Sequence, residues 1–145
     1  MTPSDEAKVT TIATRFARSL DRSHWAEARA MLAAQCEYFT GTETLRSADE
    51  IVASYRQAAE RAAEHLDSVR YESQLDGVAG REATVLFVDR IEHGGQQHDY
   101  RTRQVLTVGP DGKIHRIVNR ESGDERRRLE EFFKRCHVTW PPAAG

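Results

Sequence analysis

The sequence lacks long hydrophobic runs, and this absence argues against a membrane-spanning protein. No stretch of about 18 consecutive apolar residues is present, which is the length that a transmembrane helix needs. The first residues, Met1-Thr-Pro-Ser-Asp-Glu6, lead directly into an amphipathic pattern and do not resemble a signal peptide. We therefore expect a cytoplasmic protein with no membrane partner.

The sequence also has few cysteines and only a small net charge. Cys36 and Cys136 lie far apart and fit no metal-binding or redox spacing, so we expect two reduced thiols and no metal site. The formal net charge is -2 with 30% charged residues, and nothing in this balance points to a nucleic acid partner.

Repeats, linkers and low-complexity segments are missing as well. A chain of 145 residues is long enough for one domain with its own hydrophobic core. We expect a single domain over residues 1–137, followed by a loose tail over residues 138–145.

The segment over residues 83–122 predicts three strands joined by two turns. Residues 83–91 are rich in β-forming residues and lead to the turn signal His93-Gly-Gly-Gln96. The second strand ends at Gly109-Pro-Asp-Gly112, and the third covers residues 113–122. Turns of this length connect neighbouring strands directly, so the three strands are expected to be antiparallel.

The two turns also predict a register. If Gly94 and Gly95 form a two-residue turn, Asp89 lies opposite Tyr100. If residues 109–112 form a four-residue loop, Glu121 lies beside Tyr100 and Asn119 beside Thr102. The opposite face of this sheet is rich in arginine, whereas one face gathers a mixed set of side chains: Val85, Phe87, Asp89, Ile91, Tyr100, Thr102, Gln104, Leu106, Ile117, Asn119 and Glu121.

Helices are predicted before and after these strands in the sequence. The first begins near Pro3 and ends at residue 20, and Ser23 is expected to cap a second helix whose buried stripe runs from residue 25 to residue 32. A short strand over residues 36–41 and its return partner at residues 44–46 precede a third helix, which a capping box at residues 47–50 opens and which ends near residue 64. A second capping box, at residues 122–125, opens a C-terminal helix.

One more long strand is predicted over residues 65–75, closed by a loop over residues 76–80. The order of elements indicates an α+β fold. A curved antiparallel sheet of about four long strands, with a short strand pair, wraps around three N-terminal helices and carries an extra C-terminal helix.

Five local patterns accompany this order: Arg15-Phe16 through Asp21, Trp25-Ala-Glu-Ala-Arg-Ala-Met-Leu32, Cys36-Glu-Tyr38, Arg46-Ser-Ala-Asp-Glu-Ile51 and Gly112-Lys-Ile-His-Arg-Ile117. Together they resemble the nuclear transport factor 2-like superfamily, in its SnoaL-like branch, over residues 6–122. The resemblance implies a cone-shaped, cystatin-like fold with a pocket between the concave sheet face and the helices. That fold hosts enzymes as well as proteins that only bind or dimerise, so it does not settle function.

The resemblance to ketosteroid isomerases does not extend to their catalytic residues. Matching the helix and strand patterns puts Phe16 at the tyrosine of the oxyanion hole, Gln104 at its acid, and Tyr38 or Thr40 at the base. All three residue types have changed, and steroid isomerase chemistry is not expected.

The resemblance to limonene-type epoxide hydrolases is also incomplete. Asp89 matches their acid, but Phe87 stands at the arginine position and Asn119 at the base. An epoxide hydrolase-like reaction would need Glu121 to substitute. Asn119 also matches a strand asparagine of scytalone dehydratase-like enzymes, whose paired inward histidines have no counterpart here.

The predicted row Asp89, Tyr100 and Glu121 is our candidate catalytic site. Two carboxyl groups on an apolar sheet face cannot both be charged without cost, so one pKa is expected to rise and leave an acid beside a carboxylate. Such a pair suits proton transfer, with Tyr100 as hydrogen-bond donor. The alternative is that both carboxyls lie in solvent at the mouth of the cone or pair with arginine.

A second set of side chains is expected to contact a ligand in the pocket. It combines aromatic rings with hydroxyl and amide groups: Phe16, Tyr38, Tyr55, Tyr71, Phe87, Thr102, Gln104 and Asn119. Inward-facing amides need hydrogen-bond partners, which a polar ligand or a buried water supplies. The tyrosines alternatively fill the core.

The sequence thus favours an enzyme that isomerises, dehydrates or cyclises a small apolar, oxygen-bearing molecule by acid and base catalysis, with no cofactor. The opposing hypothesis is a non-catalytic module of the same fold that binds a ligand or dimerises. The arginine-rich outer face also carries Leu86, Val88, Val105 and Val118. An apolar strip with charged edges favours a homodimer through this face.

Overall fold

The computed structural model describes residues 3–140, which form four helices and six strands. The helices are α1 (Pro3–Asp21), α2 (Trp25–Ala30), α3 (Ala48–His65) and α4 (Gly123–Arg135). The strands are β1 (Leu32–Phe39), β2 (Thr44–Leu45), β3 (Ser68–Ala79), β4 (Glu82–His93), β5 (Gln96–Val108) and β6 (Ile114–Arg120).

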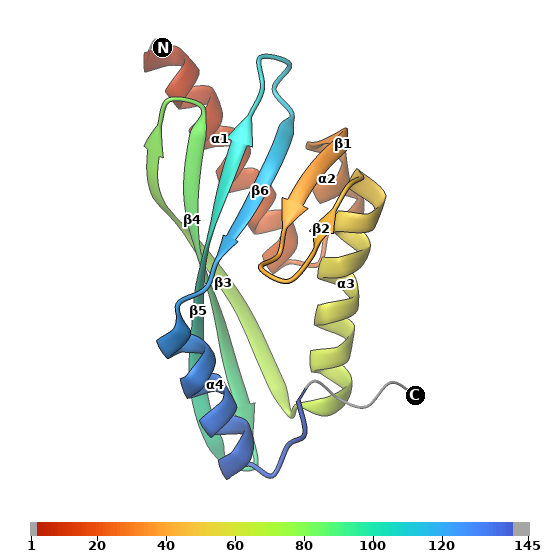
Figure 1. Cartoon of the computed structure of the whole chain (residues 1–145), viewed down its shortest axis with the longest axis vertical. Helices are drawn as coiled ribbons and strands as arrows, with labels where there is room; N and C mark the ends of the chain where they lie inside the picture. Colours follow the sequence, from red (N-terminus) through yellow and green to blue (C-terminus); the bar gives the residue numbers. More distant parts are fainter. Residues whose placement is uncertain (1–2, 141–145) are drawn as a thin grey trace.

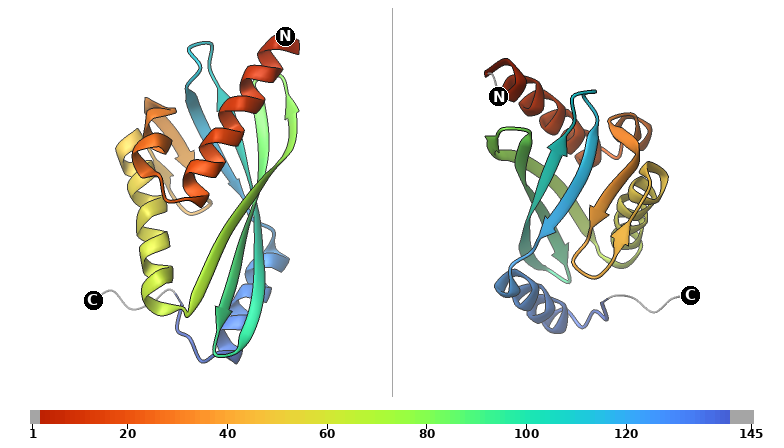
Figure 2. Two further views of the ribbon diagram at one scale, coloured as in Figure 1. Left: turned by 180° about the vertical axis from the view of Figure 1, so that it is seen from behind. Right: turned by 45° about the horizontal axis from the view of Figure 1, so that its top comes forward.

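All six strands belong to one curved sheet in the order β2-β1-β6-β5-β4-β3. Helices α1 and α3 lie against the concave side of this sheet, and α4 lies at the end where β4 and β5 meet (Figures 1 and 2). The predicted α+β class, with a curved sheet wrapped around helices, is confirmed. The sheet is mixed, because β1 runs parallel to β6 while every other pair is antiparallel.

Serine caps fix the beginnings of two helices. The Ser47 hydroxyl accepts a hydrogen bond from the backbone N–H of Glu50 at the start of α3, and the Ser122 hydroxyl accepts one from Glu125 at the start of α4, both at 3.1 Å. The predicted cap at Ser23 is wrong. Ser23 adopts a positive φ of 57°, and His24 precedes α2 without a side-chain cap. Helix α2 is short, and its predicted last residue, Leu32, begins β1.

The hairpin of β4 and β5 has the predicted register. Asp89 lies opposite Tyr100, and the pairing continues from His93 with Gln96 to Glu82 with Thr107. Both glycines of the turn, Gly94 and Gly95, have positive φ values of 58° and 77°, as a type I′ turn requires.

The predicted register of β6 is wrong by two residues. Asn119 lies opposite Gln104 and not opposite Thr102. Two offsets of one residue each add up: Val108 pairs with Ile114 instead of Lys113, and the register then shifts by one more residue between Thr107 and Val108. Because the shift is an even number, the side chains keep their predicted face. The strand ends at Arg120, however, so Glu121 never reaches Tyr100.

Strand β3 is longer than predicted. Its expected closing loop is instead a bulge between Leu75 and Val78, in which Gly77 has a φ of 134°, and the strand continues to Ala79. The turn to β4 falls at residues 80–81. Tyr71 lies opposite Asp89 and Leu75 opposite Val85, so β3 adds its Tyr71 face to the concave side.

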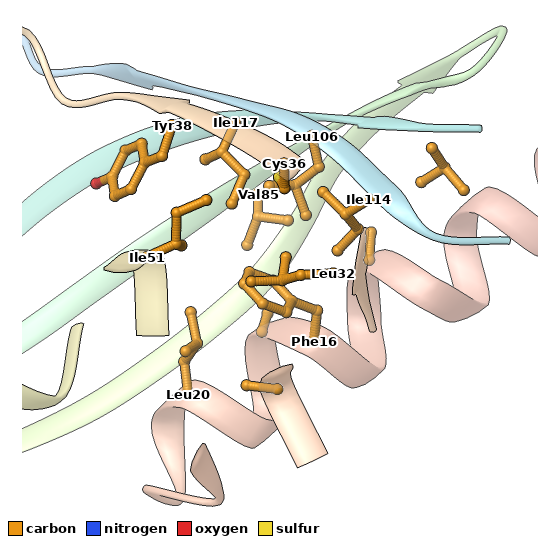
Figure 3. Packing of buried hydrophobic residues seen from close by; sticks show 14 of the residues in the cluster. Phe16, Leu20, Leu32, Cys36, Tyr38, Ile51, Val85, Leu106, Ile114 and Ile117 are labelled. Atoms are coloured by element: carbon orange, nitrogen blue, oxygen red, sulfur yellow. The ribbon is translucent and has the colours of Figure 1, made fainter. Parts of the chain in front are cut away.

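The core consists of two clusters. The larger one joins α1, α3, β1 and the sheet around fully buried side chains such as Phe16, Ile51 and Leu106 (Figure 3). In the smaller one, Phe132 and Phe133 of α4 pack against Leu66 and Ile91.

The segment after α4 begins differently from the expected loose tail. The backbone N–H of Val138 donates to the Phe133 carbonyl at 2.9 Å, and the Trp140 ring stacks on Phe133 with 5.1 Å between centroids. The remaining residues of the predicted tail, 141–145, lie outside the described residues, as does Thr2 at the start of the first helix.

Candidate functional site

A cavity of about 270 Å³ lies between the concave sheet face and the helices. Most of its wall is aliphatic or aromatic, and α1, α3, α4 and strands β3 to β5 all contribute to it. The lining residues are Leu20, Asp21, Trp25, Tyr38, Tyr55, Ala58, Ala59, Ala62, Leu66, Val69, Tyr71, Phe87, Asp89, Ile91, Tyr100, Thr102, Gln104, Leu129, Phe133 and Trp140.

Asp89 is the central polar group of this wall. It lies in the middle of β4, between Tyr71 of β3 and Tyr100 of β5. Within the described residues its carboxyl group forms no hydrogen bond or ion pair. Burial, reinforced by the nearby charge of Asp21, raises the pKa of Asp89 to about 7. The carboxyl group can therefore exchange a proton with a bound molecule near neutral pH.

Asp21 is a second cavity carboxyl, and we did not select it from the sequence. It is the last residue of α1, and its Oδ2 accepts a hydrogen bond from the Ser73 hydroxyl at 2.5 Å. Burial raises the pKa of Asp21, and the Ser73 hydrogen bond opposes this rise. A signal was present in the sequence, because an acidic residue at a helix C-terminus faces the negative end of the helix dipole and needs another reason to be there.

Three side chains of the cavity wall form a hydrogen-bonded cluster. The Tyr55 hydroxyl donates to Gln104 Oε1 at 2.6 Å, and Gln104 Nε2 donates to the Tyr38 hydroxyl at 3.0 Å. The two tyrosine rings stack with 5.3 Å between centroids. Burial raises the pKa of Tyr38 to about 12 and that of Tyr55 well above its ordinary value, so both hydroxyls stay protonated. The Gln104 amide keeps one N–H and one lone pair for other partners.

Most of the predicted site residues lie together on the cavity wall. Asp89 and Tyr100 of the predicted catalytic row are there, with six of the eight predicted ligand contacts: Tyr38, Tyr55, Tyr71, Phe87, Thr102 and Gln104.

Three predicted site residues do not line the cavity. Phe16 is fully buried in the larger core cluster. The Asn119 amide donates to the Thr40 carbonyl at 3.3 Å, because Val118 pairs with Phe39 of β1 and so places Asn119 beside Thr40. Glu121, past the end of β6, accepts a hydrogen bond from Arg126 Nε at 2.7 Å. The predicted pair of Asp89 with Glu121 is therefore wrong, and Asp21 is the carboxyl that shares the cavity with Asp89.

The C-terminal helix contributes more to the site than its sequence predicts. Leu129 and Phe133 of α4, followed by Trp140, close the wall beside Tyr100. The helix is held at the free edge of β5, where Glu125 Oε2 accepts the backbone N–H of Arg101 at 3.3 Å. Strand β6 ends before this point, so α4 and not a strand lies beside this part of β5.

The outer face of the sheet has a different character. Arg90 pairs with Glu72 at 3.0 Å and with Asp99 at 2.8 Å, and Arg103 pairs with Asp76 at 2.7 Å. Much of the positive charge on this face is thus balanced locally. Within residues 3–140 no group of three or more His, Cys, Asp or Glu side chains is placed to hold a metal ion. No helix of this described part has the length and apolar character needed to cross a membrane.

Comparisons with known proteins support the fold. No protein-family model and no curated protein sequence matches the chain. Among solved structures, an LEH-like epoxide hydrolase of M. tuberculosis superimposes with a TM-score of 0.65 at 16% identity, over 90% of this chain and 98% of the other. A nuclear transport factor 2-like protein of unknown function from Burkholderia pseudomallei gives 0.66 at 16% identity, over 84% and 96%. A cystatin-like domain of unknown function from Nostoc punctiforme gives 0.59 at 21% identity, over 93% and 88%.

These likenesses, together with the curved sheet and the cavity on its concave side, define the class as a cone-shaped, cystatin-like α+β fold. Within that class the chain has a nuclear transport factor 2-like fold, which is the fold that the resemblance read from the sequence implied. Sequence identities this low are evidence for a shared fold but not for a shared activity.

Proposed function

We propose that this protein binds a small apolar molecule with an oxygen function and moves a proton on it by means of Asp89, without a metal or organic cofactor. The observation that supports the proposal is a half-buried carboxyl with a pKa of about 7 in an apolar cavity. Near neutral pH such a group is present in both protonation states, which a residue that donates and accepts protons needs.

The reaction class is an isomerisation, dehydration or cyclisation. As a base, the Asp89 carboxylate takes a proton from a carbon next to a carbonyl, and the C–H electron pair stays on the substrate as an enolate. As an acid, Asp89 returns that proton to another carbon or to oxygen. Tyr71 lies next to Asp89, and its pKa is raised to about 12, so its hydroxyl remains a hydrogen-bond donor at neutral pH.

The cavity wall fits a neutral substrate. Its polar groups are few, and none of the described residues that line it is basic. Apolar side chains therefore supply most of the binding energy, while Thr102 and the free N–H of Gln104 are left to hold substrate oxygens.

Exchange of carbon-bound protons with D₂O tests the proposal without knowledge of the natural substrate. The protein is incubated in D₂O at pD 7 with a panel of small hydrophobic ketones, and deuterium at the carbon next to the carbonyl is followed by proton NMR. We expect exchange of at least one ketone, and an Asp89→Asn variant that is slower by on the order of 100-fold or more.

Asp99→Asn is the matched control, because Asp99 carries the same charge on the outer face of the sheet. It is expected to exchange like the wild type. If ketones that bind, as shown by thermal stabilisation, exchange no faster than in buffer, proton transfer by Asp89 is wrong and the protein is a non-catalytic binding module.

That binding module is the second candidate function, and one observation favours it. The Tyr38, Gln104 and Tyr55 side chains already satisfy much of each other's hydrogen-bonding capacity, which leaves few free polar groups for catalysis. An epoxide hydrolase-like reaction is the third candidate, suggested by the similarity to the M. tuberculosis protein. The cavity wall carries Phe87 where the resemblance places an arginine, so we rank it last.

A further inference from the structure

The proposed function uses Asp89 alone, yet the cavity contains a second carboxyl group. Asp21 ends α1 and Asp89 lies in the middle of β4, and both side chains line the same cavity. Strand β3 contacts both residues. Its Tyr71 lies opposite Asp89, and its Ser73, two residues further along the strand, donates a hydrogen bond to Asp21.

The two carboxyl groups have unequal hydrogen bonding. The Ser73 hydroxyl donates to Asp21 Oδ2 at 2.5 Å, whereas the Asp89 carboxyl has no donor within the described residues. A hydrogen bond donated to a carboxylate favours its ionised form. The local environment therefore favours the charge on Asp21 and the proton on Asp89.

No cation in the cavity offsets two negative charges. The lining residues described include no lysine, arginine or histidine. The other ionisable groups that line the cavity are four tyrosines: Tyr38 on β1, Tyr55 on α3, Tyr71 on β3 and Tyr100 on β5. Arg22 and Glu72 act electrostatically on Asp21 with opposite signs. Two carboxyl groups in one apolar space, without a cation, hold a proton more readily than two charges.

We propose that Asp21 and Asp89 act as one proton-sharing pair, in which Ser73 keeps the negative charge on Asp21 and leaves the exchangeable proton on Asp89. The catalytic use of this pair rests on the proposed function. Asp89 is the group that exchanges the proton with substrate, and Asp21 is a positioning residue that acts through the charge it presents to Asp89.

The pair accounts for a complete proton cycle. At rest it holds one proton and one negative charge. When Asp89 gives its proton to a substrate oxygen, the O–H electron pair stays on the carboxylate and the pair carries two charges. Repulsion between these charges favours the return of a proton from a substrate carbon, whose C–H electron pair stays on the substrate. The pair ends with one proton, as it began.

Carboxyl titration by carbon-13 NMR tests this coupling on the full chain without any ligand. The carboxyl resonance of Asp89 is followed from pH 3 to pH 9 in the wild type and in Asp21→Asn, with Asp99→Asn as the control of equal charge change. We expect the Asp89 pKa to lie near 7 in the wild type, to fall toward its ordinary value in Asp21→Asn, and to stay near 7 in the control.

The outcomes separate the two proposals. An Asp89 pKa near 7 that does not change in Asp21→Asn overturns the pair and leaves proton transfer by Asp89 standing. An ordinary Asp89 pKa in the wild type overturns both.

Ser73→Ala is the second variant, because it keeps both carboxyl groups and removes only the donor to Asp21. With that donor gone, the proton is shared more equally, and we expect the Asp21 resonance to take over part of the titration step near neutral pH. If the titration curves of Asp21 and Asp89 are the same as in the wild type, Ser73 does not decide where the proton lies and the proposed roles are wrong.

Discussion

Burial of Asp89 makes the stability of the folded protein depend on pH in an unusual direction. Between about pH 4 and pH 7 the folded protein keeps a proton on Asp89 that the unfolded chain has lost, so stability falls as the pH rises through this window. Each pKa unit corresponds to about 1.4 kcal/mol, so the shift from 3.8 to about 7 costs on the order of 4 kcal/mol above pH 7.

Asp89→Asn removes this loss, because the amide does not ionise. We expect the variant to match the wild type at pH 4 and to exceed its stability at pH 8, by up to the same amount, in urea unfolding measured at both values. Asp111→Asn is the control of opposite sign, since the hydrogen bond with His115 lowers the pKa of Asp111 and its removal destabilises at neutral pH. Parallel pH profiles of wild type and Asp89→Asn would contradict the assignment.

The cluster of Tyr38, Gln104 and Tyr55 predicts a second effect at the scale of single residues. Tyr55→Phe removes the hydroxyl that donates to Gln104 Oε1 and leaves that buried oxygen without its partner. We expect the free energy of unfolding to fall by about 1–3 kcal/mol, measured by urea unfolding at pH 7.

Tyr71→Phe is its matched control. The Tyr71 hydroxyl also lines the cavity but forms no hydrogen bond within the described residues, so its loss is expected to change stability by less than about 0.5 kcal/mol. Equal losses in the two variants would mean that the Tyr55 hydrogen bond contributes nothing specific.

Among the elements, α4 depends on its cap and on one apolar face. The Ser122 hydroxyl satisfies the Glu125 N–H, and Leu129, Phe132 and Phe133 hold the helix against the rest of the protein. Ser122→Ala is expected to cost about 1 kcal/mol and to speed backbone hydrogen exchange in α4. Mass spectrometry of peptides from residues 123–135 measures this change.

Ser47→Ala provides the matched comparison, because Ser47 caps α3 in the same way. It should speed exchange at the start of α3 and leave α4 unchanged. If both variants affect both helices equally, the caps act on global unfolding and not on their own elements.

The elements also show what the sequence could and could not predict. Gly94 and Gly95 specify a two-residue turn, and this turn fixed the whole register of β4 with β5, including Asp89 opposite Tyr100. The register of β6 depended on a loop one residue longer than expected, which sets Val108 opposite Ile114, and on an irregularity at residues 107–108; neither has a comparable residue signature. The error of two residues moved Asn119 along the sheet without changing its face, whereas Glu121 lies past the end of β6.

The sequence failed to predict Asp21 as a cavity residue for a different reason. Asp21 meets Ser73 across 52 positions of sequence, and only the packing of α1 on β3 brings them together. Periodicity predicts which face of a helix is buried, but not which strand residue its last turn meets. For the same reason the contribution of Trp140 to the cavity wall could not be predicted from a segment without periodicity.

At the scale of the whole molecule, the two faces of the sheet differ in their surroundings. The concave face and the helices enclose the cavity, while the outer face remains uncovered within the described residues. On that face Leu86, Val105 and Val118 are partly exposed and Val88 is buried. They lie between arginines that pair with acidic residues of the same face. An apolar strip with balanced charges at its edges is self-complementary under a twofold axis.

We therefore expect a homodimer that buries this strip, with about 800 Å² covered on each partner. Val105 pairs with Val118 and Thr84 on neighbouring strands, which places it centrally on the strip. Val105→Glu introduces a charge that the interface would bury without a partner, a cost of several kcal/mol. Light scattering after gel filtration should give the dimer mass for the wild type and half that mass for the variant.

Leu75→Glu is the control, because Leu75 shares the face of Val85 and is already 36% exposed. This substitution also replaces an apolar side chain by glutamate on the same sheet, but on the face away from the strip. The Leu75→Glu variant is therefore expected to remain dimeric. A wild type with the mass of a single chain at micromolar concentration would contradict the dimer. A dimer that Val105→Glu leaves intact would mean that another surface joins the two copies.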